Sequence, residues 1–205
     1  MEYDNDCRIN PTFELVSKYE GHDELLPSRA TSKSAGYDFY VAEDTVIPAQ
    51  NTHAMILAQQ CFKPEDFVKI LSKEEDITKP FSLNEVAALT KQFNAKPTLV
   101  PTGVKVYLPR QKYLQLSVRS SCPLKYWLLL ANGVGIIDAD YYNNPDNEGH
   151  IFFQIINLFP RDIILHKGDK IGQGIILPYD LAGDLYEKKH GPAAARAGGF
   201  GSTGS

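Results

Sequence analysis

Cysteine is scarce in this 205-residue chain, and its distribution excludes both a disulfide-bonded protein and a zinc-binding one. The three cysteines, Cys7, Cys61 and Cys122, are far apart, odd in number and without a C-x-x-C pair, and the five histidines are equally scattered. This pattern excludes a disulfide framework and a zinc site built from clustered Cys and His side chains. It is typical of a reducing compartment, so we expect a cytoplasmic protein.

Long hydrophobic runs and an excess of positive charge are missing as well. The most apolar stretches, 127–137 and 151–159, are too short or too interrupted to cross a bilayer, and the acidic start MEYDNDCRIN is unlike a signal peptide. We therefore expect no membrane partner. The formal net charge of −4 disfavours a nucleic-acid partner but allows a small basic pocket for a phosphorylated ligand.

The sequence does contain a series of short predicted strands. Apolar and polar residues alternate in GYDFYVAED, TGVKVYLP and YLQLSVRSS, which is the pattern of half-buried strands. HIFFQIINLF is apolar at successive positions, which predicts a strand buried on both faces. Two apolar runs around Lys167-Gly168-Asp169 predict a hairpin. Together these features predict an all-β fold, a distorted antiparallel barrel or jelly roll.

Residues 59–98 break the strand pattern. Pro64 stands where a helix would begin, and apolar residues then recur at helical spacing. Ser82 and Glu85 form an S-x-x-E capping box ahead of a second apolar run. We therefore predict a small helical insertion within a single domain of residues 1–205. It is either a decoration of the surface, which we favour, or a module that binds a regulatory protein.

Two polar clusters lie next to predicted strands. Arg119-Ser120-Ser121 offers a guanidinium group and two hydroxyls to a phosphate, although a surface turn with an arginine ion pair explains this cluster better when it is taken alone. KGDKIGQG places Gln173 on a strand, where its amide can donate to an oxyanion, although a turn followed by a strand also explains it. Neither cluster alone identifies a site.

The segment ANGVGIIDADYY, residues 131–142, is more specific. Asp138 and Asp140 would share one face of a strand, where one carboxylate can act as a base for water, and Tyr141 adds a flat ring with a polar tip. The residues that allow tight turns and close approach of a ligand to the backbone are Asn132, Gly133 and Gly135. The alternative is a glycine-turned hairpin with solvated acids.

The chain ends in RAGGFGSTGS, which is rich in glycine yet contains Arg196 and Phe200. Glycine backbone can bring several N–H groups to one anion, and an aromatic ring can stack on a flat base. Since the chain lacks a G-x-x-x-x-G-K-[ST] motif, a P-loop is excluded. We interpret residues 191–205 as a flexible lid over a nucleotide; the alternative is a disordered terminus.

The order of these motifs resembles that of the trimeric dUTP pyrophosphatases, the dUTPase family. The resemblance covers residues 25–57 and 99–205 and omits the insertion; insertions at about this place occur in some phage dUTPases, where they are linked to binding regulatory proteins. Five short motifs characterise the family. They match SAGYDFY (34–40), SVRSSCP (117–123), NGVGIIDADYY (132–142), KGDKIGQ (167–173) and RAGGFGSTG (196–204) in this sequence.

The resemblance implies an activity, the Mg²⁺-dependent hydrolysis of dUTP to dUMP and pyrophosphate, which limits uracil in DNA. It implies that Asp138 activates the attacking water, and that Tyr141 packs under the deoxyribose and disfavours a 2′-hydroxyl. The other implied substrate contacts fall into three groups. They are Asn132 with the backbone of Gly133 to Gly135 for uracil; Arg119, Ser120, Ser121 and Gln173 for phosphates; and the tail residues Arg196, Gly201, Ser202 and Thr203 for the γ-phosphate, with Phe200 on uracil.

The resemblance also implies a homotrimer in which three subunits build each site. Mg²⁺ would be bound chiefly through the phosphates and water, with no direct protein ligand, and Asp38 would have a structural or supporting role. The chain departs from the family pattern in three places. Val118 precedes Arg119 where Gly or Pro is common, the fifth motif is one residue shorter, and a longer loop over residues 142–149 follows Tyr141.

Two other functions fit parts of the sequence. A dCTP deaminase shares the fold and the nucleotide site, but its chemistry needs a glutamate at the base, and the third motif contains none. Release of ammonia rather than pyrophosphate would identify it. A regulatory binding protein would act through residues 59–98, and deleting them would abolish partner capture while leaving turnover intact.

Overall fold

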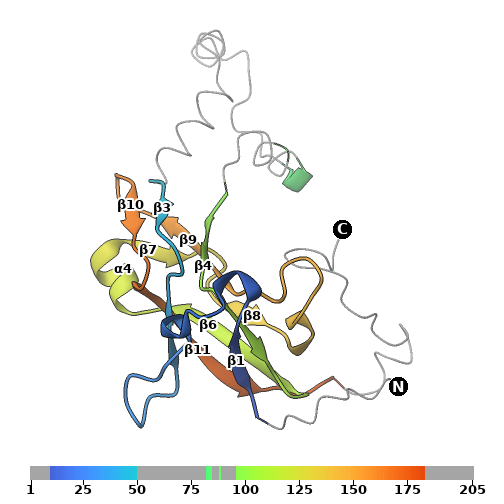
Figure 1. The fold of residues 1–205 in the computed structure, drawn as a ribbon. Helices are drawn as coiled ribbons and strands as arrows, with labels where there is room; N and C mark the ends of the chain where they lie inside the picture. Colours follow the sequence, from blue (N-terminus) through green and yellow to red (C-terminus); the bar gives the residue numbers. More distant parts are fainter. Residues whose placement is uncertain (1–9, 50–81, 85–87, 89–95, 183–205) are drawn as a thin grey trace, which may run out of the picture.

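Antiparallel strands make up most of the structure, a computed structural model that describes residues 10–49, 82–84, 88 and 96–182 (Figure 1). The strands are β1 Thr12–Leu15, β2 Tyr37–Tyr40, β3 Thr45–Ile47, β4 Thr98–Pro101, β5 Val104–Tyr107, β6 Lys112–Val118, β7 Leu128–Leu130, β8 Gly135–Ile137, β9 Phe152–Asn157, β10 Ile163–Leu165 and β11 Lys170–Pro178. Short helices lie between them: η1 Ser17–Tyr19, η2 Asp23–Leu25, α4 Ser121–Tyr126 and η3 Ala139–Tyr141. The all-β fold class predicted from the sequence is confirmed.

The strands form four small sheets whose strand order does not follow the sequence. The largest has the order β2-β11-β6-β8, the second has the order β4-β9-β7, and β1-β5 and β10-β3 form two pairs. All of these pairings are antiparallel. Neighbours in a sheet are therefore distant in sequence, and this topology brings residues from separate motifs together.

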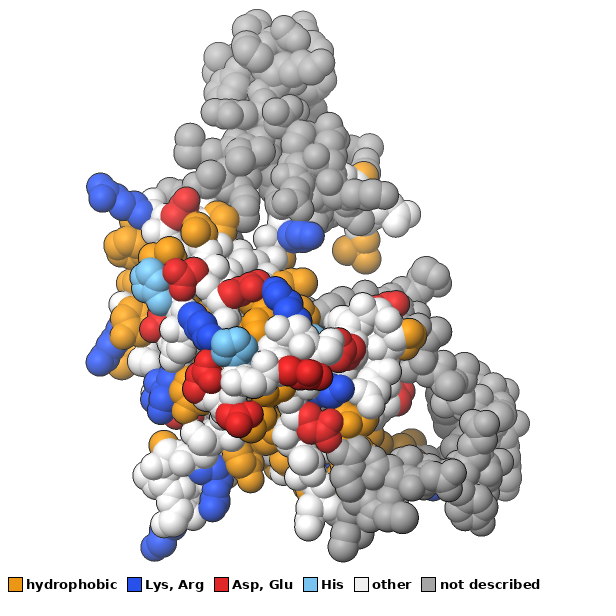
Figure 2. Space-filling view, in the orientation of Figure 1, with side chains coloured by type: hydrophobic (Ala, Val, Ile, Leu, Met, Phe, Trp, Pro, Cys, Tyr) orange, Lys and Arg blue, Asp and Glu red, His pale blue; other side chains and the backbone are white. Residues whose placement is uncertain are grey.

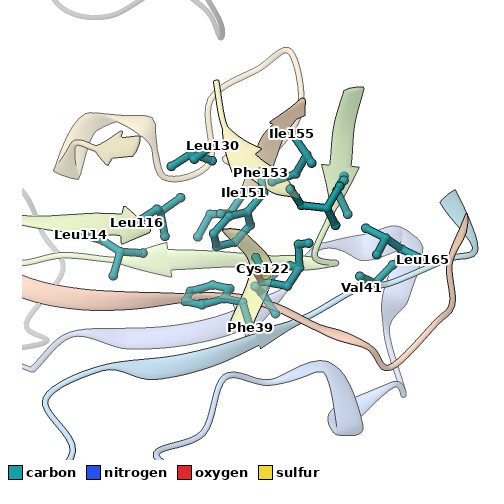
Figure 3. Packing of buried hydrophobic residues seen from close by; sticks show 14 of the residues in the cluster. Phe39, Val41, Leu114, Leu116, Cys122, Leu130, Ile151, Phe153, Ile155 and Leu165 are labelled. Carbon is teal, nitrogen blue, oxygen red and sulfur yellow. Dashed lines mark hydrogen bonds between the residues drawn. The ribbon is translucent and has the colours of Figure 1, made fainter. Parts of the chain in front are cut away.

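The buried core lies between the sheets and is filled by alternate residues of their strands (Figure 3). Phe39 of β2 and Phe153 of β9 are fully buried, with ring centroids 5.7 Å apart. Leu114 and Leu116 of β6 face the same core, as the period of two predicts. Gly172 and Gly174 of β11 leave room for the two phenylalanine rings, since a Cβ on Gly174 would lie 2.7 Å from Cε2 of Phe39.

Two sequence-based predictions are wrong in this region. HIFFQIINLF does not form a strand buried on both faces: in β9 the buried residues Phe153, Ile155 and Asn157 alternate with half-buried ones. The runs around Lys167-Gly168-Asp169 are joined by a turn, with the Asp169 N–H donating to the His166 carbonyl at 3.0 Å, but they do not pair. β10 pairs with β3, and β11 pairs with β2 and β6. The hairpin is lost because both runs find partners distant in sequence.

The predicted insertion, residues 59–98, lies largely outside the described residues. Leu83, Asn84 and Ala88 within it have helical backbone, and its last residue, Thr98, begins β4. Its extent and any partner it binds stay predictions. In the part of the chain that the structure describes, no helix is both long and apolar enough to span a membrane.

Charged side chains of both signs alternate on the face seen in Figure 2. Some charged side chains of the molecule form exposed pairs, such as Lys18 with Glu43 at 2.9 Å and Lys167 with Glu24 at 3.1 Å. Among the described residues on this face, blue and red side chains are mixed, and no continuous basic area is seen.

We expect the substitution Gly172→Ala to destabilise the protein by about 1–3 kcal/mol, because its methyl group would overlap the buried Phe153 ring. Thermal unfolding should show a lower Tm. The double variant Gly172→Ala/Phe153→Leu should recover part of the loss, because leucine vacates space that the ring occupies. A Tm for Gly172→Ala equal to that of the wild type would contradict this packing.

Candidate active site

The four-stranded sheet β2-β11-β6-β8 carries parts of four of the five motifs on adjacent strands. Asp38 of the first motif pairs in register with Gln173 of the fourth, and Gln173 pairs on its other side with Ser117 of the second. Gly135 of the third motif pairs with Leu116. Segments spread over 140 residues of sequence thus meet because of strand pairing, which the sequence alone does not specify.

Asp38 connects the first, second and fourth motifs. Its buried carboxylate lies 2.9 Å from Lys170 Nζ and 3.5 Å from Arg119 Nε. One carboxylate thus orients two cations, leaving a formal charge of +1. This matches the structural or supporting role expected for Asp38. Lys170 lies in KGDKIGQ, but no role for it is predicted from the sequence. The signal that could have identified it is its position directly after a turn, at the start of a strand.

Gln173 lies on the face of β11 opposite the core, because Gly172 and Gly174 on either side of it face inward. Its side chain lies against Gly36, where a Cβ would come within 3.2 Å of Gln173 Oε1. Gly36, in SAGYDFY, therefore leaves the space in which the Gln173 amide sits. Gln173 is half-buried and neighbours Asp38 in the strand register.

Arg119, Ser120 and Ser121 mark the change from β6 to α4, a helix that was not predicted. Ser120 precedes the helix as its N-cap residue, and Pro123 lies in its first turn, where proline is tolerated. The Cys122 N–H donates to the Arg119 carbonyl at 2.9 Å. The buried Cys122 thiol lies 3.3 Å from the Ile171 carbonyl of β11, and burial raises its pKa. These contacts fix the turn that carries the motif to the neighbouring strand.

A pocket of about 520 Å³ opens beside this turn. Its charged and hydroxyl-bearing lining residues include Arg119, Lys170, Ser121 and one carboxylate, Asp169. The remaining lining residues are Cys122, Tyr126, Leu128, Ile163, Ile164, Leu165, Gly168 and Ile171. Two cations and a hydroxyl beside apolar groups suit a phosphorylated ligand.

Asn132 and Gly133 lie in an exposed turn between β7 and β8. Gly133 has a φ of +69°, as expected of a glycine that allows a tight turn, and its N–H donates to the Leu130 carbonyl at 3.0 Å. Gly135 is buried against Leu116, where a Cβ would come within 3.0 Å of the leucine Cβ. The close approach that Gly135 permits is therefore between strands β8 and β6.

Asp138 and Asp140 are not on one face of a strand, so that prediction is wrong. β8 ends at Ile137, Asp138 is the N-cap of η3, and Asp140 lies within that helix. Asp138 is exposed, with extended backbone at φ −81° and ψ 159°. Tyr141 ends η3 with 5% of its surface exposed, and its hydroxyl donates to the His150 carbonyl at 3.0 Å.

One copy of the chain does not bring Asp138 to the Arg119 guanidinium. Leu114 pairs with Ile137, so about five residues of β6, roughly 16 Å, separate the residue next to Asp138 from Arg119. The guanidinium also turns toward Asp38 on β2, which lies three strand spacings, roughly 14 Å, from β8. The predicted base and the predicted phosphate donors thus occupy different ends of the sheet.

The predicted tail residues lie outside the described part of the chain. They are Arg196, Phe200, Gly201, Ser202 and Thr203, and their roles stay predictions.

Comparison with known proteins connects this geometry to one family. The family model described as dUTPase matches residues 82–204. A deoxyuridine 5′-triphosphate nucleotidohydrolase of Lactococcus lactis subsp. lactis is 35% identical over 94% of this chain and 97% of its own length. One from avian adenovirus 8 is 26% identical over the whole of this chain and 93% of its own length.

Solved structures give the same result. The dUTPase from Streptococcus mutans superimposes with a TM-score of 0.59 at 35% identity, covering 83% of this chain and 98% of its own. A mutant dUTPase from phage phi11 of S. aureus shares the fold at 17% identity, with a TM-score of 0.52 over 87% of this chain and 99% of its own. With four motifs on one sheet and these relatives covering most of its length, the chain belongs to the dUTPase family.

Proposed function

We propose that this protein hydrolyses dUTP to dUMP and pyrophosphate in a site shared between copies of the chain, and so limits uracil in DNA. The observation that carries the proposal is the Asp38 ion cluster, which holds Arg119 and Lys170 together at the wall of one pocket. Two oriented cations beside Ser121 suit a triphosphate chain, since charge-assisted contacts to phosphate are strong. Ser120, in the same turn, and Gln173, on the outer face of β11, would complete the set of donors.

Asp138 would be the general base. Its carboxylate is exposed at the start of η3, so it can reach a water molecule on a bound nucleotide. Asn132 and Gly133 lie in an exposed turn, from which the Asn132 side-chain amide would pair with the uracil edge, while Tyr141 would lie under the deoxyribose. The reaction would depend on positioning and charge neutralisation, because phosphoryl transfer requires little other chemistry from the protein.

Mg²⁺ would neutralise charge on the phosphates. We propose that the ion is held chiefly by phosphate oxygens and water, the oxygen ligands that Mg²⁺ prefers. The phage phi11 structure is described as revealing the coordination of a structural Mg(II) ion in that protein. Our proposal is that the substrate delivers the ion, while Arg119 and Lys170 hold the remaining phosphate charge.

The separation of Asp138 from Arg119 supports a shared site, and we propose a homotrimer. One copy would supply Asp138 and Tyr141 to the pocket of another. Large apolar side chains beside the pocket are exposed, with Leu124 at 79%, Trp127 at 57% and Ile164 at 51% of their surface, and a neighbouring copy would cover them. Residues 191–205 would close over the nucleotide; the family match extends through residue 204 and so includes their motif.

A nucleotide panel tests the activity. With Mg²⁺, dUTP should yield pyrophosphate at a rate far above that of dCTP or UTP, and chelation with EDTA should stop the release until Mg²⁺ is restored. Ammonia released from dCTP would instead identify a deaminase and overturn the proposal.

We expect Asp138→Asn to lower kcat for dUTP by about 10²–10⁴-fold, because the amide cannot accept a proton from water. Binding of a non-hydrolysable dUTP analogue, measured by calorimetry, should be nearly unchanged. Asp140→Asn is the matched control and should retain most activity. Turnover close to the wild-type rate in Asp138→Asn would disprove the assignment of the base.

The shared site predicts complementation between two inactive variants. Asp138→Asn and Arg119→Ala should each be inactive, but refolding them together at equal amounts should restore about a quarter of the wild-type sites by random assembly. The restored sites would combine Asp138 from one chain with Arg119 from the other. If the mixture stays inactive while mixed oligomers form, both residues act within one subunit and the shared site is wrong.

A further inference from the structure

The loop that follows Tyr141, residues 142–149, is the longer replacement for the short continuation usual in the family, and it folds back on Tyr141. The Tyr141 carbonyl accepts from the Asn144 side chain at 3.0 Å. The Tyr141 hydroxyl accepts from Asn147 Nδ2 at 2.9 Å while donating to the His150 carbonyl at 3.0 Å. Both the backbone and the ring tip of Tyr141 are therefore held by the same loop.

The side chains of Asn144 and Asn147 are hydrogen-bonded to each other and to the loop backbone. Asn144 Nδ2 donates to Asn147 Oδ1 at 2.8 Å, and Asn147 Oδ1 also accepts from the Gly149 N–H at 3.1 Å. Asn144 Oδ1 accepts from the N–H groups of Asp146 at 3.0 Å and Asn147 at 3.2 Å. The Asn147 amide thus has its oxygen fixed by the loop, so its nitrogen is directed at the Tyr141 hydroxyl.

The loop in turn is anchored to the β1–β5 side of the molecule. Glu148 accepts from the backbone and the hydroxyl of Ser17, and Lys105 Nζ lies 2.7 Å from Asn143 Oδ1. His150 Nε2 accepts from the Gly103 N–H at 2.9 Å, and burial lowers the pKa of His150 to about 4, which keeps the ring neutral near neutral pH. The support of Tyr141 therefore extends from β5 through the loop to the ring tip.

We propose that Asn147 is a positioning residue that fixes the Tyr141 ring and thereby sets the preference for a deoxyribose over a ribose nucleotide. This inference rests on the proposed function, in which Tyr141 lies under the sugar. With its proton committed to the His150 carbonyl, the hydroxyl has no hydrogen to offer a 2′-hydroxyl, and the ring cannot move aside to admit one.

The test compares Asn147→Ala with Tyr141→Phe, measuring kcat/KM for dUTP and for UTP by pyrophosphate release. Each variant should lower the dUTP/UTP selectivity by about tenfold, since each removes the same hydrogen bond to the ring tip. In the double variant the two effects should not add, because the interaction is already lost in either single variant. The change should appear mainly as better use of UTP, with kcat for dUTP changing less.

Thr45→Val is the matched control, since it removes one side-chain hydrogen bond, from Thr45 to the Glu43 carbonyl at 2.8 Å, outside the loop. It should leave the selectivity at the wild-type value. If Asn147→Ala lowers Tm but not selectivity, Asn147 is merely structural and the proposal is overturned. Should Asn147→Ala fail to fold, an unchanged selectivity in Tyr141→Phe overturns it. Absence of dUTP hydrolysis by the wild type would instead defeat the proposed function itself.

Discussion

The buried carboxylate of Asp38 is the constraint on which the site depends. It lies on β2, yet it orients Arg119 from the end of β6 and Lys170 from the start of β11. A buried carboxylate without partners would be costly, and two cations side by side would repel each other, so the three groups stabilise one another only in this arrangement. The strand order β2-β11-β6 is thereby coupled to the orientation of the groups proposed to hold phosphate.

Local pattern was sufficient to predict much of this fold. Alternation of apolar residues located β5 and β6, because Val104, Val106, Leu114 and Leu116 face the core at every second position. Residue type rather than alternation indicated the tight turn at Asn132 and Gly133, which is exposed in the structure. Local pattern could not predict which strands pair. It predicts a hairpin of β10 and β11, but each of these strands pairs with strands that are distant in sequence.

In the site, too, residue types could be predicted from the sequence but contacts could not. Residue chemistry indicates Arg119 and the resemblance implies a supporting role for Asp38, but the ion pair between them depends on tertiary structure. Asp138 and Asp140 were placed on one strand face because their spacing allows it, whereas β8 ends at Ile137 and a short helix follows. The hydrogen bonds from Asn144 and Asn147 to Tyr141 could not be predicted from the sequence either, since polar loop residues have no periodic pattern.

The position of the Cys122 sulfur affects how well the protein resists oxidation. Cys122 lies in α4, buried against β11 beside the turn that carries Arg119, and its raised pKa keeps the side chain in the thiol form. Oxidants and alkylating agents attack the exposed thiolate, so this cysteine is protected by both its protonation and its burial. Under oxidative stress the phosphate-binding corner should therefore resist damage for as long as the strands around it stay packed.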